Sequence, residues 1–162
     1  MECDGPLLDS GCLDCDNGRA EQEETEDRLV DGSSDDLEEL KEAEKVQART
    51  LYRHHENLAT VRDKIAMMEV DRGQLSSALR RLWLGVEYTR TRYGEGSIEL
   101  GHELLKLSDV LLAKLQSEGG DQVELSAVLR EALTIFSTQH GSDSRNCMEI
   151  KQKLDFLGAN QS

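Results

Sequence analysis

The sequence repeats itself at a spacing of 47 residues, and this repeat constrains the fold more than any other feature. A shift of 47 places aligns small residues with small ones, large apolar residues with large ones, and helix breakers with breakers. Such pairs are Ile65 and Leu112, Gly73 and Gly120, Leu82 and Leu129, Gly85 and Ala132, Gly94 and Gly141, and Ser97 and Ser144. Periods of about 20–50 residues mark units that bury their apolar faces by stacking on their neighbours. The repeat therefore favours an interaction domain over an enzyme.

Apolar residues recur at steps of three and four in six segments, the pattern of amphipathic helices. The low aromatic content, 4%, and the single proline also favour an all-α fold. We predict about six helices arranged as antiparallel hairpins joined by glycine-containing turns. The segments are Leu37–Val46, Leu58–Met68, Leu75–Val86, Leu100–Leu115, Leu125–Phe136 and Cys147–Leu157.

Several residues predict how these helices begin, end and pack. Asn57 and Asp121 are expected N-caps, and Gly73 and the pair Gly119-Gly120 are expected to end the helices before them, with Gly120 aligned to Gly73 in the repeat. The segment after Ser97 is apolar over much of its circumference, so we expect it at the centre of the array. The last segment has no helix after it in the sequence and is expected to cap the array.

The charge of the chain is concentrated at its N-terminus. Residues 1–40 carry a net charge of −13, out of −14 for the whole chain. We interpret residues 16–34 as a disordered acidic linker, in preference to a dedicated acidic interaction tail, and residues 35–158 as the helical domain. Nucleic-acid binding is not expected, because it requires clustered Lys and Arg. No membrane span or secretory signal is evident, which predicts a cytoplasmic or nuclear protein.

Each repeat resembles a degenerate tetratricopeptide (TPR) motif. The first copy matches it at Ile65-Ala66, Gly73, Ala78, Leu82 and Gly85, although the spacing of 47 residues exceeds the usual period of about 34. Some TPR domains clamp a peptide carboxylate with Lys, Asn and Arg. The corresponding positions here are not suited to a carboxylate, so we do not predict that clamp; they are Asp63, Met67, Leu107 and Leu111.

The segment Arg92–Leu112, RYGEGSIELGHELLKLSDVLL, resembles the C-terminal helical domain of the SET and MYND domain-containing protein-lysine methyltransferases, and is most similar to their TPR-bearing member. The turn Gln139–Ser144 fits the same pattern. The N-terminal run from Cys3 to Cys15 is similar to the cysteine-rich stretch that binds zinc just after the SET domain. The resemblance therefore marks residues 1–15 as a partial post-SET segment.

The resemblance implies that a complete relative transfers methyl groups from S-adenosylmethionine to protein lysines. In such a protein this domain would wall one side of the substrate cleft and bind other proteins. The chain contains no Asn-His dipeptide, no SET core and no MYND cysteine cluster. We therefore expect a fragment or short form without catalytic or cofactor-binding residues of its own. The alternative is a free-standing helical-repeat adaptor that is unrelated to methylation.

Three cysteines suggest an incomplete zinc site. Cys12 and Cys15 form a Cys-x-x-Cys hook, and Cys3 lies nine residues upstream. A closed structural site needs four ligands, with thiolates about 2.3 Å from the metal. The resemblance implies that the missing ligand precedes Met1. The alternative is a set of free thiols in a disordered arm.

The remaining reactive or aromatic residues have structural interpretations. Cys147 lies on the apolar face of the last helix and is expected to be a buried thiol. None of the four histidines is assigned to catalysis, and His140 is expected to pack a helix end. Trp83 lies beside the apolar stripe of its helix, where it is either an exposed anchor for a partner protein or packed against the neighbouring hairpin.

Overall fold

The structure is a computed structural model, and it describes residues 7–8, 11–12, 36–51 and 55–159. The described part contains six helices, which confirms the predicted all-α class. They are α2 (Leu37–Thr50), α3 (Glu56–Asp71), α4 (Leu75–Tyr93), α5 (Ile98–Ser117), α6 (Gln122–His140) and α7 (Arg145–Ala159). Two short strands, β1 (Leu7–Leu8) and β2 (Gly11–Cys12), pair antiparallel with Leu7 opposite Cys12. The sequence did not predict this small hairpin.

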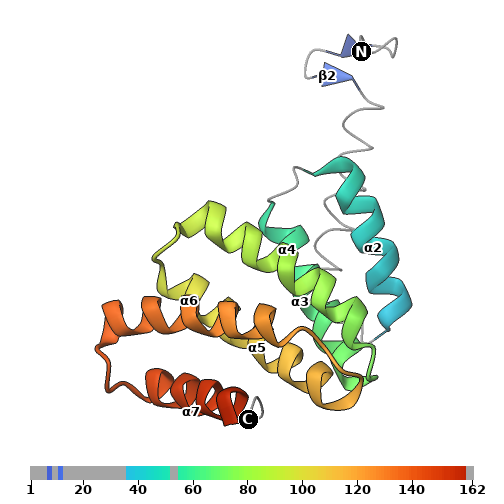
Figure 1. The fold of residues 1–162 in the computed structure, drawn as a ribbon. Helices are drawn as coiled ribbons and strands as arrows, with labels where there is room; N and C mark the ends of the chain where they lie inside the picture. Colours follow the sequence, from blue (N-terminus) through green and yellow to red (C-terminus); the bar gives the residue numbers. More distant parts are fainter. Residues whose placement is uncertain (1–6, 9–10, 13–35, 52–54, 160–162) are drawn as a thin grey trace.

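The helices form a linear array in which each one packs against the next in the chain. Figure 1 shows α2 at one end, followed by α3 and α4, and then α5, α6 and α7. The predicted disordered linker, residues 16–34, lies outside the described residues. Because neighbours in sequence are neighbours in space, the fold is an array of helical hairpins, as predicted.

The 47-residue repeat is visible in the helix boundaries. Helices α4 and α6 begin 47 residues apart and end 47 residues apart, and α5 and α7 begin 47 residues apart. Gly94 and Gly141 follow the ends of α4 and α6 with φ angles of 95° and 85°. The prediction that Gly120 fills the turn position of Gly73 is wrong by one residue. Gly119 takes the positive φ, 78°. The reason is that α5 ends at Ser117, only 46 residues after the end of α3 at Asp71, so the turn comes one residue earlier than the repeat predicts.

The apolar core is divided into two unequal clusters. The large cluster extends from α3 to α7 and includes Leu104, Leu107, Leu129 and Phe136, all fully buried. The small cluster joins α2 to α3 through Leu37, Leu40, Val61, Ile65 and the partly buried Met68. Helix α5 packs against both α4 and α6, which confirms its predicted central position.

The structure confirms one predicted N-cap and corrects the other. Asp121 caps α6 by accepting hydrogen bonds from the backbone N–H groups of Val123 and Glu124. Asn57 is not the cap of α3. The Nδ1 atom of His55 accepts from the backbone N–H of Asn57 at 3.2 Å, so the helix begins at Glu56. An imidazole nitrogen thus supplies the acceptor that we expected from an amide oxygen.

The predicted apolar stripe of α2 is wrong at its last position. Val46 is 46% exposed, whereas the neighbouring Gln47 is only 2% exposed. Successive steps of three residues fall short of a helical turn, so Val46 lies about 180° around the helix from Leu37. The buried face therefore continues through Gln47, and its amide has no hydrogen-bond partner.

Candidate functional site

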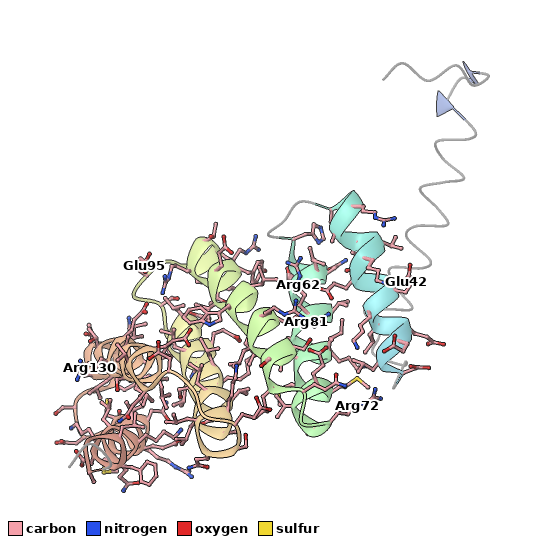
Figure 2. The ribbon with its side chains drawn as sticks, turned by 45° about the vertical axis from the view of Figure 1, so that its right-hand side comes forward. Glu42, Arg62, Arg72, Arg81, Glu95 and Arg130 are labelled. Carbon is pink, nitrogen blue, oxygen red and sulfur yellow. The ribbon has the colours of Figure 1, made fainter. Side chains whose placement is uncertain are left out.

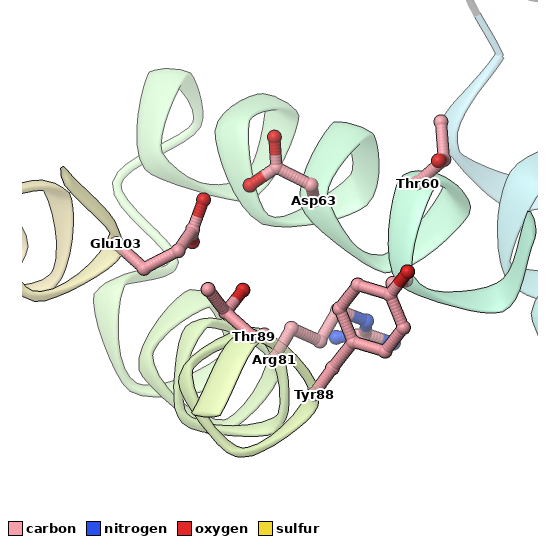
Figure 3. Close-up of a pocket in the computed structure, with 8 residues that line it drawn as sticks. Thr60, Asp63, Arg81, Tyr88, Thr89 and Glu103 are labelled. Carbon is pink, nitrogen blue, oxygen red and sulfur yellow. The ribbon is translucent and has the colours of Figure 1, made fainter. Parts of the chain in front are cut away.

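A polar groove between α3, α4 and α5 is the strongest candidate site in the described residues. We call it the α3–α5 groove, and its volume is about 210 Å³. Figure 3 shows its walls, with Asp63 on one side, Tyr88 and Thr89 on the other, and Glu103 at one end. Its lining consists of Ala59, Thr60, Asp63, Arg81, Gly85, Tyr88, Thr89 and Glu103.

Lys106 of α5 connects two carboxylates of the groove. Its ammonium donates to Asp63 of α3 and to Glu103 one turn earlier on α5, the latter at 3.0 Å. Burial alone lowers the pKa of Lys106, but these two hydrogen bonds outweigh burial and leave its pKa raised. Two negative charges thus share one positive charge, and a net negative charge remains.

Glu103 lies directly over a glycine of α4. A Cβ atom built on Gly85 would be 3.5 Å from the Glu103 Oε2 atom, which is an ordinary van der Waals distance. Gly85 therefore leaves space between its backbone and the carboxylate. Position 132, its counterpart in the second repeat, is an alanine. This part of the groove consequently belongs to the first copy of the repeat alone.

Thr89 contributes a hydroxyl to the groove. The residue is only 6% exposed, and its hydroxyl makes no hydrogen bond to another of the described residues. Helical threonines ordinarily donate to the carbonyl four residues earlier. The four other threonines whose side chains the structure describes do so: Thr60, Thr91, Thr134 and Thr138. Figure 3 shows the Thr89 hydroxyl directed toward the space between Asp63 and Glu103.

Arg81 lines the groove with its stem, but its guanidinium is already paired. It donates to both carboxylate oxygens of Glu69, at 3.0 and 2.9 Å, and to Glu44 of α2 at 2.8 and 3.0 Å. Arg62 also donates to Glu44, at 3.1 Å. Figure 2 shows Arg62 and Arg81 beside each other where α2 meets the α3–α4 hairpin. The Arg81 guanidinium is therefore committed to this ion-pair network.

Tyr88 adds an aromatic ring and a neutral hydroxyl to the groove. Burial raises the pKa of its phenol, and the negative charge of Glu56 adds to the effect. The phenol consequently remains protonated at neutral pH. A ring face beside carboxylates favours positively charged groups over negatively charged ones.

The predicted zinc ligands are only partly covered by the structure. Cys12 belongs to β2, while Cys3 and Cys15 lie outside the described residues. Across the described ranges, no group of three or more His, Cys, Asp or Glu side chains could hold a metal ion. Zinc binding therefore stays a prediction.

Other predicted residues can be placed directly. Cys147 is fully buried, as predicted, and its thiol contacts the Gly141 carbonyl oxygen at 3.4 Å. His140 lies at the end of α6, where its ring stacks on Phe136 with centroids 6.4 Å apart, in agreement with its predicted packing role. Trp83 is 37% exposed, so part of its ring is accessible to a partner.

The positions that correspond to a TPR carboxylate clamp do not line the groove as a set. Leu107 and Leu111 are buried in the large cluster, and Met67 is exposed. Lys106, one residue before Leu107, reaches the groove carboxylates instead. Its charge is neutralised by Asp63 and Glu103, so the groove does not provide a carboxylate clamp.

Comparison of the chain with protein-family models and with curated proteins found no match. The resemblance to the SET and MYND methyltransferases therefore rests on the sequence motifs alone. Among the described helices, none has the length and apolar character needed to cross a membrane.

The sequence predicts the helices that form the groove but does not bring its residues together. Gly85 belongs to the repeat, Glu103 to the segment Arg92–Leu112 and Asp63 to a position unsuited to a clamp, while no sequence pattern marks Tyr88 or Thr89. One signal was available: the pair of Gly85 and Ala132 differs between the two repeats. A glycine inside a helix often marks a close approach of another group.

Proposed function

We propose that this chain is a protein-binding helical-repeat domain of TPR type, derived from the C-terminal region of a SET and MYND family protein-lysine methyltransferase. The observation that carries the protein-binding part is the repeat itself. Helices α4 and α6 have boundaries offset by 47 residues, and among the described helices each packs mainly against its neighbours in the chain. Arrays of this kind offer extended surfaces along which other polypeptides bind.

The α3–α5 groove is the surface we propose for that binding. Its volume of about 210 Å³ lies below the roughly 300–1,000 Å³ of small-molecule and cofactor sites. A groove of this size suits a side chain of a docked peptide better than a nucleotide-sized cofactor. The exposed Trp83 on α4 is a second proposed contact, because tryptophan is enriched among residues that dominate binding energy.

The methyltransferase part of the proposal is supported by the segment Arg92–Leu112 and the cysteine-rich run at residues 3–15. In a complete enzyme, S-adenosylmethionine and the target lysine would bind to a SET core, and this domain would contribute to the choice of protein substrate. We propose that the 162-residue chain alone transfers no methyl group. Incubation with labelled S-adenosylmethionine and a protein array tests this directly, since any labelled product would contradict it.

A selection experiment tests the protein-binding part. A peptide-display library is panned against the purified chain, and the selected peptides are then cross-linked to it and mapped by mass spectrometry. We expect enriched peptides whose cross-links fall on α3, α4 or α5. A library that yields no enriched sequence would contradict the proposed binding function.

A free-standing adaptor unrelated to methylation is the second candidate, because a linear array of helical hairpins would serve such a protein equally well. Zinc content separates the two proposals. We compare the 162-residue chain with a version extended upstream by the genomic reading frame. Tight zinc binding only in the extended chain supports a divided post-SET site, whereas one zinc per short chain supports an independent module.

A further inference from the structure

We propose that the α3–α5 groove binds a basic side chain, arginine or lysine, presented by an extended segment of a partner protein. This inference rests on the proposed protein-binding function and names the chemistry that the groove recognises. It is based on three observations: a threonine hydroxyl that lines the groove without a partner among the described residues, a lysine shared by two carboxylates, and a glycine that keeps one wall open.

The Thr89 hydroxyl is the observation that points to a ligand. Thr89 is 94% buried, but its hydroxyl does not donate to the backbone carbonyl four residues earlier, as the hydroxyls of the other described helical threonines do. The Thr89 oxygen remains accessible from the groove that the residue lines, so the hydroxyl is available to water or to a ligand atom there. Because the hydroxyl faces the groove, a ligand atom in the groove can complete its hydrogen bonding.

The charges around the hydroxyl determine the sign of the ligand. Asp63 and Glu103 share the single ammonium of Lys106, and the second oxygen of Asp63, Oδ2, makes no hydrogen bond within the described part of the chain. The nearest guanidinium, that of Arg81, is occupied by Glu44 and Glu69. An anion would therefore meet net repulsion, whereas a cation would find acceptors at Asp63 Oδ2 and at the Thr89 hydroxyl.

The shape of the groove is suited to a long, flexible side chain. Gly85 and Ala59 contribute little side-chain volume, and the Tyr88 ring offers an apolar surface for methylene groups and a face for a cationic head. Residues 41–162 carry a net charge of only −1, so the attraction of a basic group depends on the local carboxylates Asp63 and Glu103. Charge complementarity therefore supports a basic segment as the occupant.

NMR titration of the full 162-residue chain tests the proposal. The probe is the peptide acetyl-Ala-Ser-Arg-Ser-Ala-amide, compared with versions that carry lysine, citrulline or glutamate at the centre. Citrulline has nearly the shape of arginine but no charge. We expect saturable amide shifts around Asp63, Thr89 and Glu103 with the arginine and lysine peptides only. Equal binding of the citrulline peptide would overturn the proposal, as would shifts spread over other acidic surfaces.

Two variants separate binding from folding. Thr89→Val keeps the β-branched shape and removes a hydroxyl that has no partner, so the fold should be retained. Loss of one hydrogen bond to a charged ligand should weaken peptide binding roughly tenfold. Gly85→Ala places a methyl group in the groove at an ordinary contact distance and should also weaken binding while α4 becomes more stable. Unchanged affinity in both variants would overturn the proposal.

A matched variant controls for the loss of charge. Lys153 stands 47 residues after Lys106 and bridges Asp109 of α5 and Glu149 of α7 in the same way. Asp63→Asn should weaken binding of the arginine peptide, and Asp109→Asn should leave it unchanged. An alternative outcome is that display selection yields peptides that cross-link to another face and whose affinity is the same for the wild type and Thr89→Val. In that case the protein-binding function stands and this inference fails.

Discussion

The α2–α3 junction and the α5–α6 junction join neighbouring helices by different means. At the α5–α6 junction, Gly101 allows the backbone of α5 to approach Phe136, and the contact is almost entirely apolar. At the α2–α3 junction, a small apolar cluster is supplemented by Glu44, which receives hydrogen bonds from both Arg62 and Arg81. The α5–α6 junction is thus held by burial of apolar surface, whereas the α2–α3 junction combines a smaller apolar cluster with ion pairs.

This difference teaches that the array is not uniformly stable. Apolar burial contributes in proportion to area, whereas ion pairs lose much of their attraction to desolvation and salt. The buried amide of Gln47, which has no partner, weakens the α2–α3 junction further. We therefore expect α2 to detach before the helices from α3 to α7 unfold.

Truncation of Phe136 should have the largest effect. The ring is fully buried and also contacts His102 edge-on, with centroids 5.2 Å apart. Phe136→Ala should reduce the free energy of unfolding by about 3–5 kcal/mol, measured by urea denaturation. Leu40→Ala is the matched variant in the small cluster. Hydrogen exchange should show lost protection across the whole array for Phe136→Ala but only in α2 for Leu40→Ala; the same pattern for both would contradict a divided core.

Neutralising Glu69 should weaken the charged junction. Its side chain is 1% exposed, and it accepts two hydrogen bonds from the Arg81 guanidinium. Glu69→Gln leaves Arg81 with a weaker partner in a buried setting, so we expect a loss of about 1.5–3 kcal/mol in the free energy of unfolding. Glu42→Gln, which alters an exposed pair with Lys45, serves as the control and should change little. Comparable losses in the two variants would show that burial of the pair is unimportant.

Two helical glycines offer a finer test of packing, one at the α4–α5 contact and one at the α5–α6 contact. A Cβ atom on Gly101 would lie 3.1 Å from Ile135 Cγ2 and 3.3 Å from Phe136 Cζ, whereas Gly85 has no contact closer than 3.5 Å. Gly101→Ala should therefore be less stable than Gly85→Ala by about 1–3 kcal/mol. Thermal unfolding monitored by circular dichroism measures the difference. Equal stability would mean that the α5–α6 junction adjusts to the added methyl group.

The sequence predicted the helices well because the relevant signals are local. Apolar periodicity, the glycine before each connection and the Asp121 cap depend on residues within one or two turns of one another. The 47-residue repeat even predicted that α4 and α6 share their boundaries. The errors at Asn57 and Val46 each concern a choice between two nearby residues. His55 rather than Asn57 caps α3, and Gln47 rather than Val46 is buried on α2.

The candidate groove could not be derived from the sequence for a different reason. Its residues come from three helices, and none of them forms a spaced motif. That Thr89 lacks a backbone hydrogen bond, or that Asp63 and Glu103 share Lys106, depends on how α3, α4 and α5 pack. Sequence periodicity indicates which face of a helix is buried, but it does not indicate which polar residues of separate helices meet.

The two lysine bridges should give the smallest effect and the most direct comparison between repeats. Lys106 links α5 to α3, and Lys153 links α7 to α5. Each ammonium retains contact with solvent, so Lys106→Met and Lys153→Met should each lower the free energy of unfolding by only about 0.2–1 kcal/mol.

The pH dependence of these bridges has a defined sign. Burial lowers the pKa of both lysines, but the hydrogen bonds to their carboxylates dominate and raise it. Each bridge should therefore contribute fully to the free energy of unfolding below the pKa of a lysine in the unfolded chain, about 10.4. The contribution should be lost as the pH rises through the higher pKa of the same lysine in the folded protein. Urea titrations of the wild type and both variants should converge in alkaline solution. Lys106→Met should also change peptide binding, because Asp63 and Glu103, the two partners of Lys106, line the groove. Lys153→Met should leave peptide binding unchanged.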